Sequence, residues 1–138
     1  KKDGARIHVV AGTYDGQVGA MQAEHVQAQY LDVELEPGAQ WELQTVPSDT
    51  LFVYLMMGEA GVGPEPESII PYRHAILFSE GDVFRVQAGA VRTRFILMSG
   101  KPLREPIAWG GPIVMNTREE LNLAFSELRS NTFIKNQE

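Results

Sequence analysis

The chain has 138 residues, no cysteine and a formal net charge of −6, from 12 Lys and Arg against 18 Asp and Glu. The absence of cysteine excludes disulfides, thiolate nucleophiles and thiolate metal ligands, and an acidic surface disfavours direct binding to nucleic acid. Residues 51–57 form the longest apolar stretch, which is far too short to span a membrane, and the start of the chain has no signal-peptide pattern. We therefore expect a globular, cytoplasmic domain without nucleic-acid or membrane partners.

Short segments of strand character run through the first hundred residues. Residues 30–36 alternate most clearly, with Leu31, Val33 and Leu35 on one face and three acidic residues on the other. The expected strands are residues 6–11, 30–36, 40–46, 51–57, 75–78, 82–86 and 93–98, with a further short strand after the turn at residue 58. The unbroken apolar run at residues 51–57 favours a central strand. Many short strands separated by Gly and Pro turns are typical of a β-sandwich or barrel.

The last third of the chain has a different pattern. Residues 101–109 contain two prolines and predict an extended loop. Thr117 and Glu120 have the spacing of a capping box, which predicts that a helix begins there and runs to about Arg129. The apolar side chains expected to form one stripe on this helix are Leu121, Ala124, Phe125 and Leu128.

A distinctive motif fills residues 95–133. A strand ends in Gly100-Lys101-Pro102-Leu103, a loop then carries Glu105-Pro106 and Gly111-Pro112, and Met115-Asn116-Thr117 opens the helix. The order and spacing of these residues resemble the closing signature of the pirin family. Looser similarities to the same family lie at residues 3–12, 35–39 and 54–59.

The resemblance implies the fold and the place of the chain in a longer protein. It implies an all-β, cupin-type jelly-roll barrel or sandwich over residues 1–138, with the terminal helix of about residues 117–129 packed outside it. Pirin-family proteins pair two such barrels, and their iron site of three His and one Glu lies in the N-terminal barrel. This chain corresponds to the C-terminal barrel, so the resemblance implies that the iron-binding barrel is absent from it. Since the chain starts at Lys1 without Met, we expect it to begin inside a longer gene product.

Metal-binding cupins hold their ion with two His spaced by one residue, a nearby Glu and a later His. This spacing works because alternate residues of a strand point the same way. At the corresponding positions this chain has Glu42 and Gln44, and later Arg92 and Arg94. We therefore expect no metal, cofactor or catalytic residue in this chain.

The three histidines lie far apart in the sequence. We expect His8 on the polar side of the first strand, His25 in a solvated stretch and His74 at a turn or sheet edge. A site of two His and one Glu is the alternative. Glu42 is the acid expected at the mouth of the barrel, either as an acid of a ligand pocket, or as an outward strand residue or a carboxylate paired with an arginine such as Arg92 or Arg94.

Other residue types that carry chemistry have simpler interpretations. The pairs Glu65/Glu67 and Glu119/Glu120 are expected to be a loop and a helix start. No local spacing supports a Ser-His-Asp arrangement of Ser48, His8 and Asp49, and the glycines of residues 12–19 do not lead from a strand into a helix as a phosphate loop does. The aromatic residues expected to anchor the core or a loop, with pocket lining as the alternative, are Tyr14, Trp41, Phe52 and Trp109.

Two functional hypotheses follow. In the first, the chain is a metal-free C-terminal barrel with no enzymatic activity of its own, and it packs against the N-terminal cupin domain of the same protein or self-associates. The second hypothesis is a quercetinase-like dioxygenase, or a small-ligand-binding cupin, that uses the interior of this barrel. Full-length members of the family resemble quercetin 2,3-dioxygenase, and such an activity would depend on the half of the protein that this chain lacks.

Overall fold

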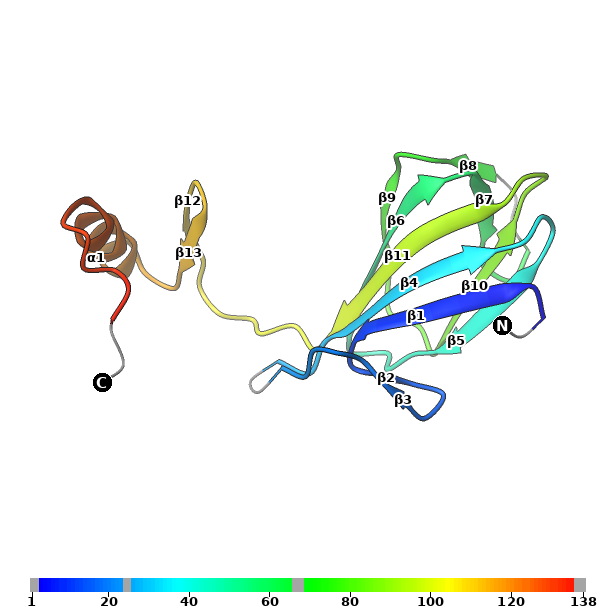
Figure 1. The fold of residues 1–138 in the computed structure, drawn as a ribbon, viewed down its shortest axis with the longest axis horizontal. Coiled ribbons are helices and arrows are strands. Elements are labelled where there is room, and N and C mark those ends of the chain that lie inside the picture. Colours follow the sequence, from blue (N-terminus) through cyan, green and yellow to red (C-terminus); the bar gives the residue numbers. More distant parts are fainter. Residues whose placement is uncertain (1–2, 24–25, 66–68, 136–138) are drawn as a thin grey trace. The chain divides into compact units, whose positions relative to one another are not determined.

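The computed structural model describes residues 3–23, 26–65 and 69–135, and Figure 1 shows it as a ribbon. The chain divides into two compact units, Lys1–Pro102 and Leu103–Glu138. The first unit is made of strands. The second contains a short hairpin followed by the helix.

The larger sheet of the first unit has five antiparallel strands in the order β1-β4-β11-β6-β9. Their bounds are β1 Ala5–Ala11, β4 Gln29–Leu35, β11 Thr93–Gly100, β6 Thr50–Met57 and β9 Ala75–Leu77. Leu31, Val33 and Leu35 of β4 are fully buried, so the predicted inner face of residues 30–36 is confirmed. A shift of one residue would turn these side chains to solvent, which is why the alternation also specifies the register.

The second sheet has four strands in the order β5-β10-β7-β8. They are β5 Gln40–Gln44, β10 Val83–Ala88, β7 Glu59–Val62 and β8 Ile69–Pro71. The two sheets face each other in Figure 1 and bury one continuous apolar cluster between them. They do not close into a complete barrel. The predicted all-β jelly-roll class is confirmed, in its sandwich form.

Aromatic rings fill the middle of the sandwich. Trp41 of β5 lies 6.1 Å from Phe84 of β10 and 6.0 Å from Phe95 of β11, measured between ring centroids. The Trp41 indole Nε1 donates a hydrogen bond of 3.0 Å to the hydroxyl of Tyr14, so its polar atom is satisfied. Tyr14 belongs to the small hairpin of β2 (Thr13–Tyr14) and β3 (Gln17–Val18). The prediction that Tyr14 and Trp41 anchor the core is confirmed.

Five short strands were not predicted: β2, β3, β8, β12 (Ala108–Gly110) and β13 (Ile113–Met115). Strands of two or three residues show no recognisable alternation, so periodicity cannot find them. The prediction of a loop at residues 101–109 is wrong at its end, because Trp109 pairs with Val114 in the β12–β13 hairpin. Gly111 turns this hairpin with φ of +56°, a conformation that glycine adopts readily.

The helix α1 (Arg118–Arg129) packs on this hairpin within the second unit. Both hydrogen bonds of the predicted capping box are present: Thr117 Oγ1 accepts from the Glu120 amide, and the Glu120 carboxylate accepts from the Thr117 amide. Leu121 and Ala124 are buried, whereas Leu128 is 45% exposed, so Leu128 was wrongly included in the apolar stripe. The packing of this helix outside the barrel stays a prediction. In the described part of the chain, no helix is long and apolar enough to cross a membrane.

Candidate functional site

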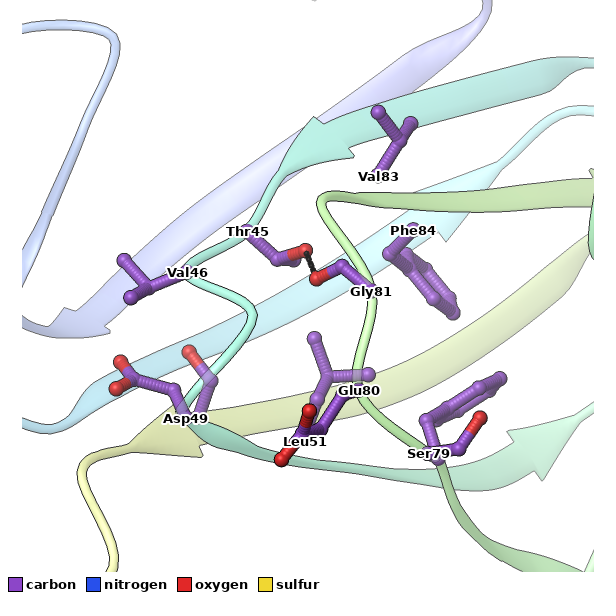
Figure 2. A pocket seen from close by; sticks show the side chains of 11 residues that line it. Thr45, Val46, Asp49, Leu51, Ser79, Glu80, Gly81, Val83 and Phe84 are labelled. Atoms are coloured by element: carbon purple, nitrogen blue, oxygen red, sulfur yellow. Dashed lines mark hydrogen bonds between the residues drawn. The ribbon is translucent and has the colours of Figure 1, made fainter.

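A pocket of about 160 Å³ opens between two loops of the sandwich (Figure 2). One loop follows β5 and contributes Asp49, and the other follows β9 and contributes Glu80. The apolar lining comes from Leu51, Phe78 and Phe84. Phe78 and Phe84 meet edge to face at 5.2 Å between ring centroids, so the apolar part of the pocket is an extension of the packed core.

Hydrogen bonds between the two loops hold the pocket in shape. The Thr45 hydroxyl donates to the carbonyl oxygen of Gly81 at 2.8 Å, as Figure 2 shows, and the Thr45 amide donates to the carbonyl oxygen of Asp82 at 2.8 Å. On the other side, the Phe78 amide donates to the Leu51 carbonyl at 3.0 Å. These bonds fix both loops before any ligand arrives, so binding would require little ordering of the backbone.

Besides Thr45, the polar side chains at the pocket are Asp49, Glu80, Ser79 and Ser99. Asp49 and Ser99 are half-buried, and Ser79 and Glu80 are exposed. Among the residues that the structure describes, none of these four side chains makes a hydrogen bond or ion pair within the protein. They are therefore available to a ligand.

Acidic residues on the strands are used differently, because they pair with arginines. Asp32 of β4 accepts two hydrogen bonds from Arg94 of β11, at 2.9 Å from Nε and 2.5 Å from Nη2. The hydrogen bond from Arg94 is the main cause that lowers the pKa of the Asp32 carboxyl, and partial burial opposes it. His8 lies opposite Asp32 on β1 and adds to the lowering.

The interpretation of Glu42 as an outward strand residue, or as a carboxylate paired with an arginine, is confirmed. The arginine is Arg85, at 2.6 Å, and not one of the two named examples, Arg92 and Arg94. The register explains this, since Arg85 of β10 lies directly opposite Glu42 of β5. Arg92 instead pairs with Glu36 at 3.2 Å. Glu42 therefore does not face the interior of the sandwich.

The two histidines in the described residues, His8 and His74, lie at opposite edges of the five-stranded sheet. His8 is exposed on β1, as expected. His74 is exposed in the turn before β9, and its ring Nδ1 is 3.0 Å from the Pro71 carbonyl oxygen, so the predicted turn position is confirmed. His25, like Glu67, lies outside the described residues. Within residues 3–23, 26–65 and 69–135, no group of three His, Asp or Glu side chains is close enough to hold a metal ion.

The interior positions do not fit a metal either. Next to Glu42 and Gln44, the inward side chains of β5 are Trp41 and Leu43, and both are buried in the apolar core. Phe95, which lies between Arg94 and Ile96 on β11, is also fully buried there. A metal at this place would need imidazole or carboxylate ligands where indole and phenyl rings pack. An iron site like the one that the resemblance implies for the N-terminal barrel therefore does not fit this sandwich.

Other predicted residues have clear places. Glu65 lies in an exposed loop, Glu119 in the first turn of α1, and Ser48 next to Asp49 in the loop after β5, whereas His8 lies in the β1–β4 ladder. Phe52 lies half-buried on the outer face of β6, not in the core. Trp109 is 70% exposed, and its Nε1 donates to the Gly111 carbonyl at 2.7 Å. The pocket residues Glu80, Ser79 and Ser99 carried no sequence signal, because contacts between distant loops create the pocket.

The two-sheet sandwich with its crossing connections defines the chain as a cupin domain. The sequence profile of the Pirin C-terminal cupin domain matches residues 30–134. Since this covers more than half of the 138 residues, the chain belongs to the pirin family. The resemblance seen in residues 95–133 is thereby confirmed.

Curated relatives are about twice as long as this chain. Pirin from Homo sapiens is 36% identical over 133 residues, which are 94% of this chain and 45% of that protein. Pirin-1 from Arabidopsis thaliana is 33% identical over 134 residues, covering 94% of this chain and 46% of the relative. The crystal structure of a protein named quercetin 2,3-dioxygenase, from Acinetobacter baumannii, superposes with a TM-score of 0.85 at 29% identity, over 96% of this chain and 45% of that one. The chain thus spans about half the length of the relatives it matches.

Proposed function

We propose that this chain acts as the C-terminal cupin of a two-cupin protein, where it packs against an N-terminal, iron-binding cupin. Its own sandwich is a structural partner in this arrangement and performs no chemistry on a metal. The observation that carries the proposal is an apolar patch on the outward side of the five-stranded sheet, where an isolated sandwich would place polar side chains.

This patch, called the outer apolar face, crosses four neighbouring strands. Met98 of β11 lies between Tyr30 of β4 and Phe52 of β6 in the ladders, and Phe52 lies opposite Leu77 of β9. Tyr54 and Ile96 form a second such pair. The residues of the outer apolar face are Tyr30, Phe52, Tyr54, Leu77, Ile96 and Met98.

Exposure supports docking on this face. Leu77 is 71% exposed, and the other five side chains of the face are half-buried. Directly opposite residues of an antiparallel pair have side chains within about 5.5 Å, so the face is contiguous and not a scatter of single residues. Burial of such a surface against a partner would contribute roughly 25 cal/mol for each Å² removed from water. Aromatic residues and Met are also typical of interface cores.

The interior of the sandwich supports the same proposal. Trp41, Phe84 and Phe95 pack ring against ring at about 6 Å in the place where a catalytic cupin needs space for a metal and its substrate. Loss of this packing would be costly, since removal of a buried phenyl ring destabilises a protein by about 3–5 kcal/mol.

Two experiments test the proposal. The sequence encoded upstream of Lys1 should contain a His-x-His segment with a downstream Glu, and its absence would contradict the proposed architecture. The N-terminal cupin encoded there, purified as a separate chain, should form a 1:1 complex with this chain in sedimentation velocity.

Variants identify the surface. The double substitution Phe52→Ser and Met98→Ser should weaken the complex by at least about tenfold, because central apolar residues dominate interface energy. Val18→Ser is the matched control, since Val18 is also apolar and 66% exposed but belongs to the separate β2–β3 hairpin and not to the outer apolar face. Equal weakening by both changes would show that the outer apolar face is not the docking surface.

A second candidate function is a dioxygenase reaction in this sandwich itself. The similarity to the Acinetobacter baumannii protein named quercetin 2,3-dioxygenase favours it, whereas the ring-filled interior does not. Metal analysis of the purified 138-residue chain separates the two candidates. Stoichiometric iron, together with cleavage of quercetin by this chain alone, would replace the first proposal with the second.

A further inference from the structure

We infer that the pocket between the loops after β5 and β9 is a binding site for a small organic cation, a primary amine that carries one small aromatic or branched aliphatic group. The inference concerns a different surface from the outer apolar face and does not depend on the proposed partner. It follows from the size of the pocket, the nature of its lining and the state of its acidic residues.

The size and the apolar lining of the pocket determine which apolar group of a ligand can enter. The volume is about 160 Å³, and an apolar cavity of about 150 Å³ is known to accommodate benzene. Leu51, Phe78 and Phe84 offer an apolar surface on the inner side. One six-membered ring or a branched chain of similar size can therefore enter, whereas a flavonoid-sized molecule cannot.

The acidic residues select the charge of the ligand. Asp49 and Glu80 approach the pocket from different loops, and neither carboxylate pairs with a cation in the described part of the chain. This contrasts with Asp32 and Glu42, which pair with arginines. An anion would be repelled at the pocket, and a neutral ring would gain no electrostatic attraction from the two carboxylates.

The hydroxyl groups complete the recognition of an ammonium group. Ser79 and Ser99 line the pocket beside the two acids, and each hydroxyl oxygen can accept a hydrogen bond. An ammonium group has three donors, which carboxylate and hydroxyl oxygens can satisfy together. A hard metal cation fits less well because Ca²⁺ takes about 6–8 oxygen ligands, and the described residues form no group of three acids or histidines for a metal.

Benzylamine is the probe for a titration of the ¹⁵N-labelled 138-residue chain, followed by NMR at physiological salt. Saturable shift changes are expected at amides of residues 45–46, 48–51 and 78–84. Benzyl alcohol has the same ring without the charge and should bind at least about threefold more weakly, as the loss of exposed charge pairs predicts. Benzoate should produce no saturable change.

Matched variants assign the effect to the pocket. Asp49→Asn together with Glu80→Gln should weaken benzylamine roughly fivefold to tenfold, since each exposed ion pair contributes a factor of roughly 1.5–5. Asp82→Asn removes a charge from the same loop, but the Asp82 side chain does not line the pocket, so its effect should stay below about twofold. The double variant should keep the dispersed spectrum of the parent, because the side chains of Asp49 and Glu80 make no hydrogen bond or ion pair with another described residue.

Three outcomes would overturn the inference. The first is the absence of saturable shifts with benzylamine at concentrations up to the millimolar range. The second is equal affinity for benzyl alcohol, which would remove the cation from the ligand class. The third is equal weakening by Asp82→Asn and by the double variant, which would reduce the binding to general attraction by the net charge of −6. None of these results bears on complex formation through the outer apolar face.

Discussion

The sandwich and the hairpin–helix unit bury apolar side chains to very different extents. In the described part of the sandwich, fifteen buried residues form one cluster between the sheets, and Phe95 and Leu97 have no exposed surface. In the hairpin–helix unit the buried cluster consists of Ile113, Leu121 and Ala124. The first unit therefore has an extensive apolar core, whereas the apolar core of the second unit is small.

This difference shows that sequence signals can specify a helix without making the unit that contains it stable. The helix α1 has a complete capping box, acidic residues in its first turn and Arg129 in its last, so its local structure is well specified. However, Trp109 is 70% exposed and Ile107 is 78% exposed in the same unit. A segment of this size with so small a core is marginally stable alone, and further apolar burial would be needed to hold it.

The largest effect is expected from Phe95→Ala in the sandwich. Phe95 packs against both Trp41 and Phe84, so its removal should lower the free energy of unfolding by about 3–5 kcal/mol. Urea unfolding followed by tryptophan fluorescence measures the change. Phe52→Ala is the control on the outer side of the same sheet and should cost about 1 kcal/mol or less. Similar losses for the two variants would mean that the sandwich interior is not the source of stability.

The next effect is expected from Leu121→Ala in the hairpin–helix unit. Leu121 is 2% exposed and belongs to the cluster with Ile113 and Ala124, so its truncation should cost about 2–3 kcal/mol within that unit. Hydrogen exchange should show loss of protection for the amides of α1 and unchanged protection for β4 and β11. If protection fell equally in both units, they would unfold as one cooperative body and the contrast between them would be wrong.

The sequence predicts the parts of this structure that depend on neighbouring residues. Alternation revealed the buried face of Leu31, Val33 and Leu35, and spacing revealed the capping box at Thr117. The partner of Glu42 could not be predicted, because the register of β10 on β5 joins residues far apart in the chain and places Arg85 opposite. A continuous apolar run marked β6 as central, but it could not show that its outer side chains form part of an exposed face.

The pocket is the feature that sequence patterns were least able to predict. Asp49 and Glu80 are separated by β6, β7, β8 and β9 in the chain, and a hydrogen bond between Thr45 and Gly81 joins their loops. No periodicity or motif links such positions. The sequence alone shows that the chain has no His-x-His segment. It does not show that aromatic rings fill the interior, because that packing depends on how the two sheets face each other.

A smaller effect is expected from Thr117→Ala at the start of α1. The Thr117 hydroxyl accepts a hydrogen bond of 3.2 Å from the Glu120 amide, and the loss of such a cap costs about 1 kcal/mol. Exchange of the first-turn amides of α1 should become faster by roughly fivefold, while Thr117→Ser should retain most of the protection. Equal exchange in the Ala and Ser variants would show that the hydroxyl does not stabilise this helix.

The smallest effect is expected from Asp32→Asn on the outer side of the sandwich, and it should depend on pH. The pKa of Asp32 is lowered in the folded protein, chiefly by its hydrogen bond from Arg94. A lowered carboxyl pKa stabilises the fold fully above the unfolded-state pKa, and this stabilisation is lost as pH falls through the folded-state pKa. The parent should therefore lose more stability than Asp32→Asn between about pH 5 and pH 2.

Urea midpoints measured across this pH range test the linkage. The difference in midpoint between the parent and Asp32→Asn should be constant at neutral pH and should narrow in acid, where the parent carboxyl becomes protonated. Asp49→Asn is a suitable control, because Asp49 has no arginine partner among the described residues, so its midpoint should follow the parent more closely. High salt should reduce the Asp32 effect only in part, since Arg94 is held by two direct hydrogen bonds. A difference that does not change with pH would mean that ionisation of the Asp32 carboxyl contributes nothing to the stability of the sandwich.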